Sequence, residues 1–118
     1  MPRDCLFCRI VDGEEPSEVV HTDDDLVVIK DKFPQAPVHL LVLTREHIPS
    51  AHDLTGEHDE LVAACFRAAR LVAEEHGTAG GYRIATNIGT DGGQAIPHLH
   101  FHVLGGRQLG RIDDAQAS

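Results

Sequence analysis

The chain has few aromatic and few basic side chains, and both shortages narrow the range of functions. Aromatic residues make up 4% of the 118 residues and tryptophan is absent, while 10 Lys and Arg face 19 Asp and Glu, for a net charge of −9 at pH 7. Nucleic-acid backbones are bound by basic surface, and single strands also stack on aromatic rings. We therefore expect no nucleic-acid partner. A single phosphate group is still an acceptable ligand, because backbone N–H groups and histidines bind one without a basic face.

Long apolar runs are also missing. The longest apolar stretches, 40–43 and 61–65, are far too short to cross a bilayer. The first residues of the chain contain no apolar run suited to a signal peptide. We expect a cytoplasmic protein with no membrane partner, folded as a single domain over residues 1–118.

Cysteine is scarce, and the three cysteines are Cys5, Cys8 and Cys65. An odd number in a chain without a secretion signal disfavours a disulfide framework. Cys5 and Cys8 have the spacing of a metal knuckle, or are simply two small residues on a short helix. A redox Cys-x-x-Cys motif would need a strand–helix setting that this segment lacks. Histidine, by contrast, occurs nine times.

The apolar periodicity predicts two helices and five strands. The helices are expected at 5–12 and 57–76, and the strands at 17–21, 25–30, 39–44, 82–88 and 98–104. Because these elements do not alternate as strand–helix–strand units, they favour an α+β fold with an antiparallel sheet. Thr55 is expected to cap the second helix alone, since His58 is not the Glu or Gln of a capping box.

The predicted helix at 57–76 has a wide apolar surface. Its main stripe consists of Leu61, Cys65, Ala68 and Val72, and the apolar residues beside the stripe are Val62, Phe66 and Ala69. A helix with apolar residues on more than one face usually has a second surface to cover. We therefore expect a homodimer.

Residues 98–104 alternate between histidine and apolar side chains. Successive side chains of a strand point to opposite faces, so His98, His100 and His102 would share one face, with neighbouring imidazoles roughly 7 Å apart. The alternate residues would enter the core: Leu99, Phe101 and Val103. On spacing alone the histidines suit a metal and a phosphate equally. The preceding loop, 91–94, favours phosphate, because its backbone N–H groups can form an anion nest.

Together with its flanking segments, this histidine run resembles the histidine triad (HIT) family, and within it the bacterial zinc-containing proteins of the Hint branch. The similar segments are 31–39 (DKFPQAPVH), 81–83 (GYR), Asn87, 91–94 (DGGQ) and 98–107 (HLHFHVLGGR). The resemblance covers a domain core of about 5–109 and leaves 110–118 as a C-terminal tail. It implies a five-stranded sheet with two helices, and a homodimer in which two sheets join into a larger one.

The resemblance implies a nucleotide-binding hydrolase that cleaves nucleoside 5′-monophosphate derivatives, of the adenosine phosphoramidate or acyl-adenylate type. His100 would be the nucleophile and form a nucleotidyl-histidine intermediate, and His102 would hydrogen-bond the phosphate oxygens. His98 and His39 would complete the histidine cluster. Three alternatives stay open: a nucleotide-binding sensor with little turnover, a diadenosine polyphosphate hydrolase or nucleotidyl transferase, and a protein whose histidines only bind metal.

The resemblance also implies the contacts to a purine nucleotide. Asp31 would accept both ribose hydroxyls. The positions at the phosphate would be Asn87, Gly93 and Gln94, with Ala95 in place of a frequent serine. The apolar base slot, whose members are each just as readily ordinary core residues, would comprise Phe7, Leu6, Ile10 and Ile29. Lys32 stands where an apolar residue is common, and the tail lacks the tryptophan that closes the partner's active site in some relatives.

A structural Zn²⁺ is the last implication, with Cys5, Cys8, His47 and His98 as ligands. A closed four-ligand site of this kind would pin the N-terminal helix to the sheet. It would also occupy His98 and leave His100 and His102 free for chemistry. No organic cofactor is expected.

Overall fold

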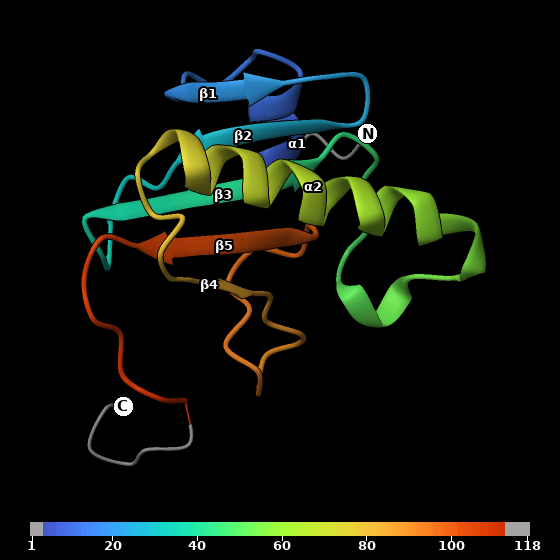
Figure 1. The fold of residues 1–118 in the computed structure, drawn as a ribbon. Coiled ribbons are helices and arrows are strands. Elements are labelled where there is room, and N and C mark those ends of the chain that lie inside the picture. Colours follow the sequence, from blue (N-terminus) through green and yellow to red (C-terminus); the bar gives the residue numbers. More distant parts are fainter. Residues whose placement is uncertain (1–3, 113–118) are drawn as a thin grey trace.

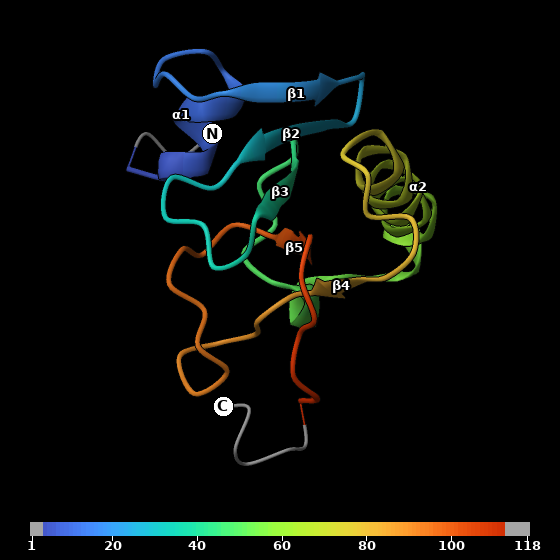
Figure 2. The same ribbon diagram turned by 60° about the vertical axis from the view of Figure 1, so that its left-hand side comes forward.

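The computed structural model describes residues 4–112, whose five strands form one antiparallel sheet in the order β1-β2-β3-β5-β4. The strands are β1 (Val19–Thr22), β2 (Leu26–Lys30), β3 (Val38–Thr44), β4 (Tyr82–Ala85) and β5 (His100–Gly105). Helices α1 (Leu6–Val11) and α2 (Asp59–Glu75) lie on opposite faces of the sheet (Figures 1 and 2). The predicted α+β class and antiparallel sheet are therefore confirmed.

The central strands β2 and β3 are apolar on both faces because helices cover both. Leu26 and Val28 belong to the core cluster that includes α2, whereas Val27 and Ile29 belong to the cluster that includes α1. Residues 40–43 of β3 divide in the same way. Such doubly covered strands read as continuous apolar runs rather than as alternating ones. The α1 side of the sheet is the side on which the functional groups gather.

Helix α2 packs through small residues. Its buried side chains are Cys65, Ala68, Ala69, Val72 and Ala73. Ala69, which was counted toward a second apolar surface of the helix, is fully buried in the core of the chain, so that part of the expectation is wrong. Two large apolar side chains of the helix remain exposed, Phe66 at 40% and Leu71 at 43%. Neither α2 nor any other helix of the described residues is long and apolar enough to cross a membrane.

Strand β5 begins at His100, two residues later than predicted. Its pairing with β3 starts at Leu43 and His100, because the N–H of Leu99 bonds the carbonyl of Ile48 instead of β3, and β3 ends at Thr44, before any residue that could lie opposite His98. His98 lies in the bend before the strand, where its N–H bonds the carbonyl of Ile96. The expectation that His98 shares a strand face with His100 and His102 is therefore wrong.

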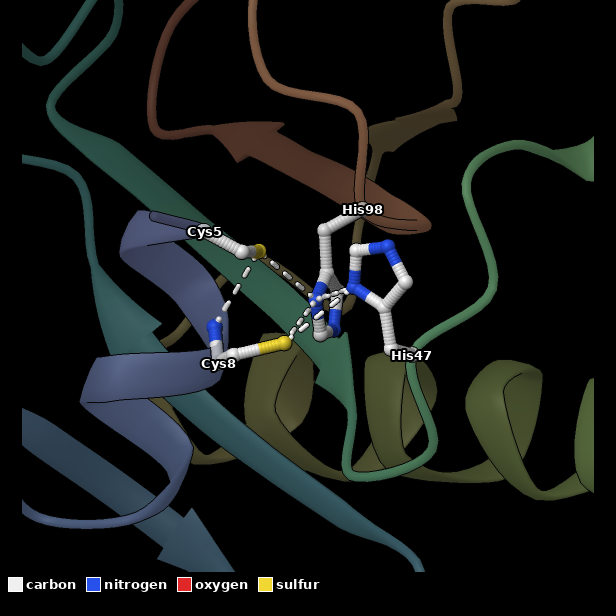
Figure 3. A group of neighbouring side chains, drawn as sticks. All are labelled: Cys5, Cys8, His47 and His98. Carbon is white, nitrogen blue, oxygen red and sulfur yellow. Dashed lines mark hydrogen bonds between the residues drawn. The ribbon is translucent and has the colours of Figure 1, made fainter. Parts of the chain in front are cut away.

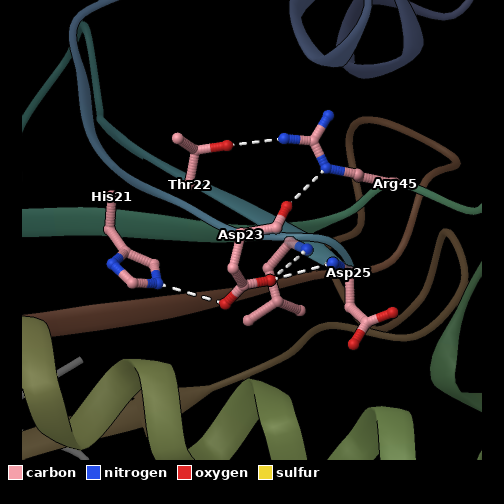
Figure 4. A network of polar contacts seen from close by, with 6 residues as sticks. His21, Thr22, Asp23, Asp25 and Arg45 are labelled. Carbon is pink, nitrogen blue, oxygen red and sulfur yellow. Dashed lines mark hydrogen bonds and ion pairs between the residues drawn. The ribbon is translucent and has the colours of Figure 1, made fainter.

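The β1–β2 hairpin is closed by Asp23 (Figure 4). One carboxylate oxygen of Asp23 accepts the N–H groups of Asp25 and Leu26 at 2.9 and 3.0 Å, and the other lies 3.1 Å from Nε2 of His21. Arg45, just beyond β3, donates from Nε to the Asp23 carbonyl at 2.8 Å. The acidic turn of the sequence is thus an Asx-type turn tied to the neighbouring strand.

The turn η2 (Gly56–His58), which follows η1 (Ala51–Asp53), leads directly into α2. Thr55 accepts a hydrogen bond at its side chain from the N–H of Glu57, and its own N–H donates to Nδ1 of His58 at 3.0 Å. The expectation that Thr55 caps alone is wrong, because the imidazole of His58 takes the place of a Glu side chain in a capping box.

Candidate functional site

A cavity of about 600 Å³ opens on the α1 side of the sheet. Its walls come from α1, the segment between β2 and β3, the loop before β5, and β5 itself. The lining residues are Leu6, Phe7, Ile10, Glu15, Pro16, Ser17, Ile29, Lys30, Asp31, Lys32, Phe33, Gln35, His39, Leu41, Asn87, Gly93, Ala95, Ile96, His100 and His102. This volume and the mixture of apolar walls with a few polar groups suit a small-molecule ligand.

Most catalytic and nucleotide-binding residues predicted from the sequence line this cavity, but His98 and Gln94 do not. Glu15, Pro16, Ser17, Lys30 and other lining residues were missed. The segment 15–17 follows α1 and carries no motif, so only the folded chain brings it to the cavity. Several of the others lie within 29–41, where the periodicity of a strand does not show which side chains reach the cavity wall.

Gln94 instead closes the loop between β4 and β5. Its Oε1 accepts the N–H of Gly89 at 2.9 Å, and its Nε2 donates to the carbonyl of Pro49 at 2.7 Å. The N–H groups of Gly92, Gly93 and Gln94 all donate to carbonyls of this same loop. These three donors therefore do not form the anion nest expected of residues 91–94. Gly93 has a φ of +84°, a conformation that favours glycine.

His100 is buried and oriented by the backbone. Its Nδ1 lies 2.7 Å from the carbonyl oxygen of His98, which can only accept, so Nδ1 carries the proton and Nε2 the lone pair. The ring of Phe7 packs edge-on against it at 5.0 Å between centroids. Burial lowers the pKa of His100 below its ordinary value, so the imidazole is neutral near pH 7.

His102 takes the opposite tautomer. The N–H of Gln35 donates to Nδ1 of His39 at 3.0 Å, so His39 carries its proton on Nε2. That Nε2 lies 2.9 Å from Nδ1 of His102, which accepts the hydrogen bond and leaves the proton of His102 on Nε2. Burial, followed by the nearby His100 and His39, lowers the pKa of His102 to about 4. The cavity therefore contains one imidazole with a free lone pair and, 5.2 Å away between ring centroids, one with a free N–H donor.

Asp31 lies beside His39 and His102. Its Oδ2 lies 3.3 Å from Nε2 of His39, and its Oδ1 accepts the N–H of Phe33 at 2.8 Å. The Asp31 charge opposes the effect of burial on the pKa of His39, which is nevertheless lowered. Asp31, His39 and His102 are close enough to share a metal ion. However, the N–H of Gln35 points at Nδ1 of His39 and holds the proton on Nε2, where a ligand would need its lone pair.

A second cluster, at the N-terminal end of β5, consists of Cys5, Cys8, His47 and His98, and can hold a metal ion (Figure 3). The Nδ1 atom of His98 lies 3.3 Å from Sγ of Cys5 and 3.5 Å from Sγ of Cys8. The Nδ1 atom of His47 lies 3.1 Å from Sγ of Cys8 and 3.3 Å from Nδ1 of His98.

Three of these four separations match a tetrahedrally coordinated ion, and the fourth, 3.1 Å between Sγ of Cys8 and Nδ1 of His47, is slightly shorter. Bond lengths of about 2.0–2.1 Å to nitrogen and about 2.3 Å to sulfur place neighbouring ligand atoms roughly 3.3–3.8 Å apart. Nε2 of His98 donates to the carbonyl of Thr44 at 2.7 Å, which leaves its Nδ1 lone pair free for the ion. Burial raises the pKa of Cys8 to about 12, so an ion must displace a firmly held proton when it binds.

Comparisons with known proteins give one consistent result. A family model described as "Scavenger mRNA decapping enzyme C-term binding" matches residues 4–115. An uncharacterized HIT-like protein of Chlamydia trachomatis is 44% identical over 107 residues, which cover 91% of this chain and 96% of that protein. The purine nucleoside phosphoramidase of Escherichia coli K12 is 38% identical over 111 residues, 93% of each chain. A solved HIT family hydrolase from Clostridium thermocellum is 38% identical, with a TM-score of 0.92 over 96% of this chain and 99% of that one.

Proposed function

The chain belongs to the histidine triad family of hydrolases, and from that premise we propose that it cleaves purine nucleoside 5′-monophosphate derivatives through a nucleotidyl-histidine intermediate. One observation carries the proposal: the buried, neutral His100 presents an unprotonated Nε2 to the cavity, beside the N–H donor of His102. A neutral imidazole is a competent nucleophile near pH 7.

The reaction has two displacements at the same phosphorus. The Nε2 lone pair of His100 attacks the α-phosphorus, the bond from phosphorus to the leaving nitrogen or oxygen breaks, and the nucleotide is held on His100. Water then attacks the phosphorus and releases the nucleoside monophosphate. Over the cycle the hydroxyl of water ends on phosphorus and its proton on the leaving group. The His98 carbonyl keeps the Nδ1–H of His100 in place, and it stabilises the positive charge on the ring while the nucleotide is attached.

The remaining cavity residues would position the substrate. His102 donates its Nε2–H to a non-bridging phosphate oxygen, where negative charge builds up in the transition state. Asn87, whose side-chain Nδ2 donates to the carbonyl of Gly92 at 2.8 Å, and Ala95 line the same cavity. Asp31 accepts the ribose hydroxyls, and the apolar base slot of Leu6, Phe7, Ile10 and Ile29 packs on the purine.

We assign the cluster of Cys5, Cys8, His47 and His98 to a structural Zn²⁺. An ion there cross-links α1 to the sheet and thereby holds one wall of the cavity. His98 acts on the reaction through its carbonyl, while its side chain is a metal ligand. We also propose a homodimer, supported by the exposed Phe66 and Leu71 on α2.

The proposed hydrolysis is tested with adenosine 5′-phosphoramidate as substrate and AMP release as the readout. Intact-mass spectrometry of alkali-quenched reactions should show a fraction of the protein carrying one added AMP, because phosphorus–nitrogen bonds to histidine survive alkali. A nucleotide-binding sensor would bind AMP and release none from the substrate. A diadenosine polyphosphate hydrolase would prefer diadenosine triphosphate in a side-by-side comparison of kcat/KM.

A further inference from the structure

The segment directly after β5 packs against the loop that precedes β3. Gly105 pairs with Val38 across the sheet. Gly106 has a φ of +93°, and a Cβ at this position would lie 2.9 Å from Cβ of Pro37. Arg107 reaches the same loop and donates from Nη2 to the carbonyl oxygen of Gln35 at 3.0 Å. The Gly-Gly-Arg sequence after the histidines is therefore shaped to fit the 35–38 segment.

Both backbone polar groups of Gln35, its carbonyl and its N–H, form hydrogen bonds. Its carbonyl accepts from Arg107, and its N–H donates to Nδ1 of His39 at 3.0 Å. His39 in turn donates from Nε2 to Nδ1 of His102 at 2.9 Å. A continuous chain of hydrogen bonds thus runs from an exposed arginine to a histidine of the cavity.

We propose that Gly106 and Arg107 form a brace that fixes the Nε2–H tautomer of His102 through Gln35 and His39. The role of this tautomer as the donor to the α-phosphate rests on the proposed function. Arg107 is then a positioning residue, which never touches the substrate.

The tautomer needs such a device because both imidazoles are neutral. Burial lowers the pKa of His39 and of His102, so both rings are neutral, and the nearby Asp31 carboxylate, whose Oδ2 lies 3.3 Å from Nε2 of His39, favours the same tautomer. A neutral imidazole can carry its proton on either nitrogen, and its neighbours decide which. If the 35–38 segment shifts and the Gln35 N–H leaves Nδ1 of His39, both rings can exchange tautomers. His102 would then present a lone pair to a phosphate oxygen, which is repulsive.

Arg107 lies in an exposed position, so its effect on the histidines can be measured apart from an effect on stability. Its side chain is exposed, and its guanidinium donates to two carbonyl oxygens, those of Gln35 and Gln108. Exposed contacts of this kind contribute little to stability. Losing them should therefore leave the fold intact and change the histidine relay.

The experiment compares Arg107→Met and Gly106→Ala with Arg107→Lys, which keeps a charged donor. Arg70→Met, at an exposed position of α2, controls for loss of charge, and Gly80→Ala, whose Cβ would meet no atom within 4 Å, controls for the added methyl group. The ¹⁵N spectrum of the histidine side chains reports the tautomer of His102 without any substrate. Steady-state kinetics with adenosine 5′-phosphoramidate report kcat and KM separately.

In the wild type, Nε2 of His102 should show the protonated nitrogen signal. Arg107→Met and Gly106→Ala should mix the two tautomers and lower kcat by roughly tenfold with little change in KM, less than the 10²-fold that an ångström of misplacement can cost. Arg107→Lys should recover part of kcat, and the two controls should match the wild type. If Arg107→Met leaves both the nitrogen signals and kcat unchanged, the brace is wrong. If the signals shift but wild-type protein hydrolyses no phosphoramidate, the brace stands and the proposed function fails.

Discussion

The carbonyl oxygen of His98 accepts the Nδ1–H of His100 at 2.7 Å, while the side chain of the same His98 belongs to the cysteine–histidine cluster. Phe7 makes a second connection, because its ring lies 5.9 Å from that of His98 and 5.0 Å from that of His100. A change at the proposed metal site should therefore also move the proposed nucleophile, His100.

Removing the metal should destabilise the protein and weaken nucleotide binding. An ion present at about 1,000 times its Kd contributes about 4 kcal/mol, which for a chain of this size corresponds to a fall in Tm of roughly 10–20 °C on removal. Chelated protein and the Cys8→Ser variant should both show this fall in calorimetry, together with a weaker Kd for AMP. Cys65→Ala keeps all four ligands and should still respond to the chelator. The metal site does not exist if wild-type protein purified without added zinc contains no metal and has the same Tm as Cys8→Ser.

His100→Ala should abolish turnover and spare binding. Without the nucleophile no nucleotidyl-histidine forms, and losses on the order of 10⁴–10⁶ in kcat accompany removal of a covalent nucleophile in comparable enzymes. AMP affinity measured by calorimetry should change little, since the base slot and Asp31 are untouched. His52→Ala, an exposed histidine of η1, serves as the control and should keep full activity. Substantial turnover by His100→Ala would mean that another group attacks the phosphorus.

The sequence was sufficient where a pattern is local. The alternation at 98–104 correctly places Leu99, Phe101 and Val103 in the core. The Cys5–Cys8 spacing suggested two metal ligands, but their histidine partners lie about 40 and 90 positions away and came only from the family resemblance. No local pattern reports which distant side chains the sheet brings to them.

The failures concern hydrogen-bond partners, which residue patterns do not report, whether the partner is distant or lies in the same loop. Alternation assigns His98 to the strand, yet β3 ends too early to pair with it. Glycines 92 and 93 predicted a turn correctly, but not that the turn would use its own N–H groups. The tautomers of His39 and His102 likewise depend on the backbone of Gln35, which sequence patterns do not describe.

Acid should destabilise the metal-free protein through its buried histidines. The folded-state pKa of His102 is about 4, below the 6.5 of an unfolded histidine, so the unfolded chain takes up the proton first as pH falls. This contribution to stability is intact above about pH 6.5 and is lost between there and about pH 4. After allowance for solvent screening we expect a loss on the order of 1–2 kcal/mol from His102.

Denaturant unfolding of metal-free protein between pH 4 and 8 measures this loss, and the absence of metal avoids acid release of thiolate ligands. His102→Gln cannot titrate and should reduce the pH dependence, whereas His52→Ala should leave it as in the wild type. An equal slope in wild type and His102→Gln would show that His102 keeps an ordinary pKa.

The dimer should depend on the exposed apolar side chains of α2. Phe66 is 40% exposed, and its ring lies 5.6 Å from that of Phe101, so its outer surface is presented beside the sheet. Strand β4 is the edge of that sheet, and no strand of residues 4–112 pairs with its outer side, which allows two sheets to join there. Phe66→Lys places a charge in such an interface and should give a monomer, while circular dichroism stays unchanged because Phe66 is outside the buried core. Light scattering at micromolar concentration measures both species, with Glu75→Gln at the C-terminal end of α2 as the control that makes the same +1 change in net charge. A monomeric wild type, or a Phe66→Lys variant that remains dimeric, contradicts this interface.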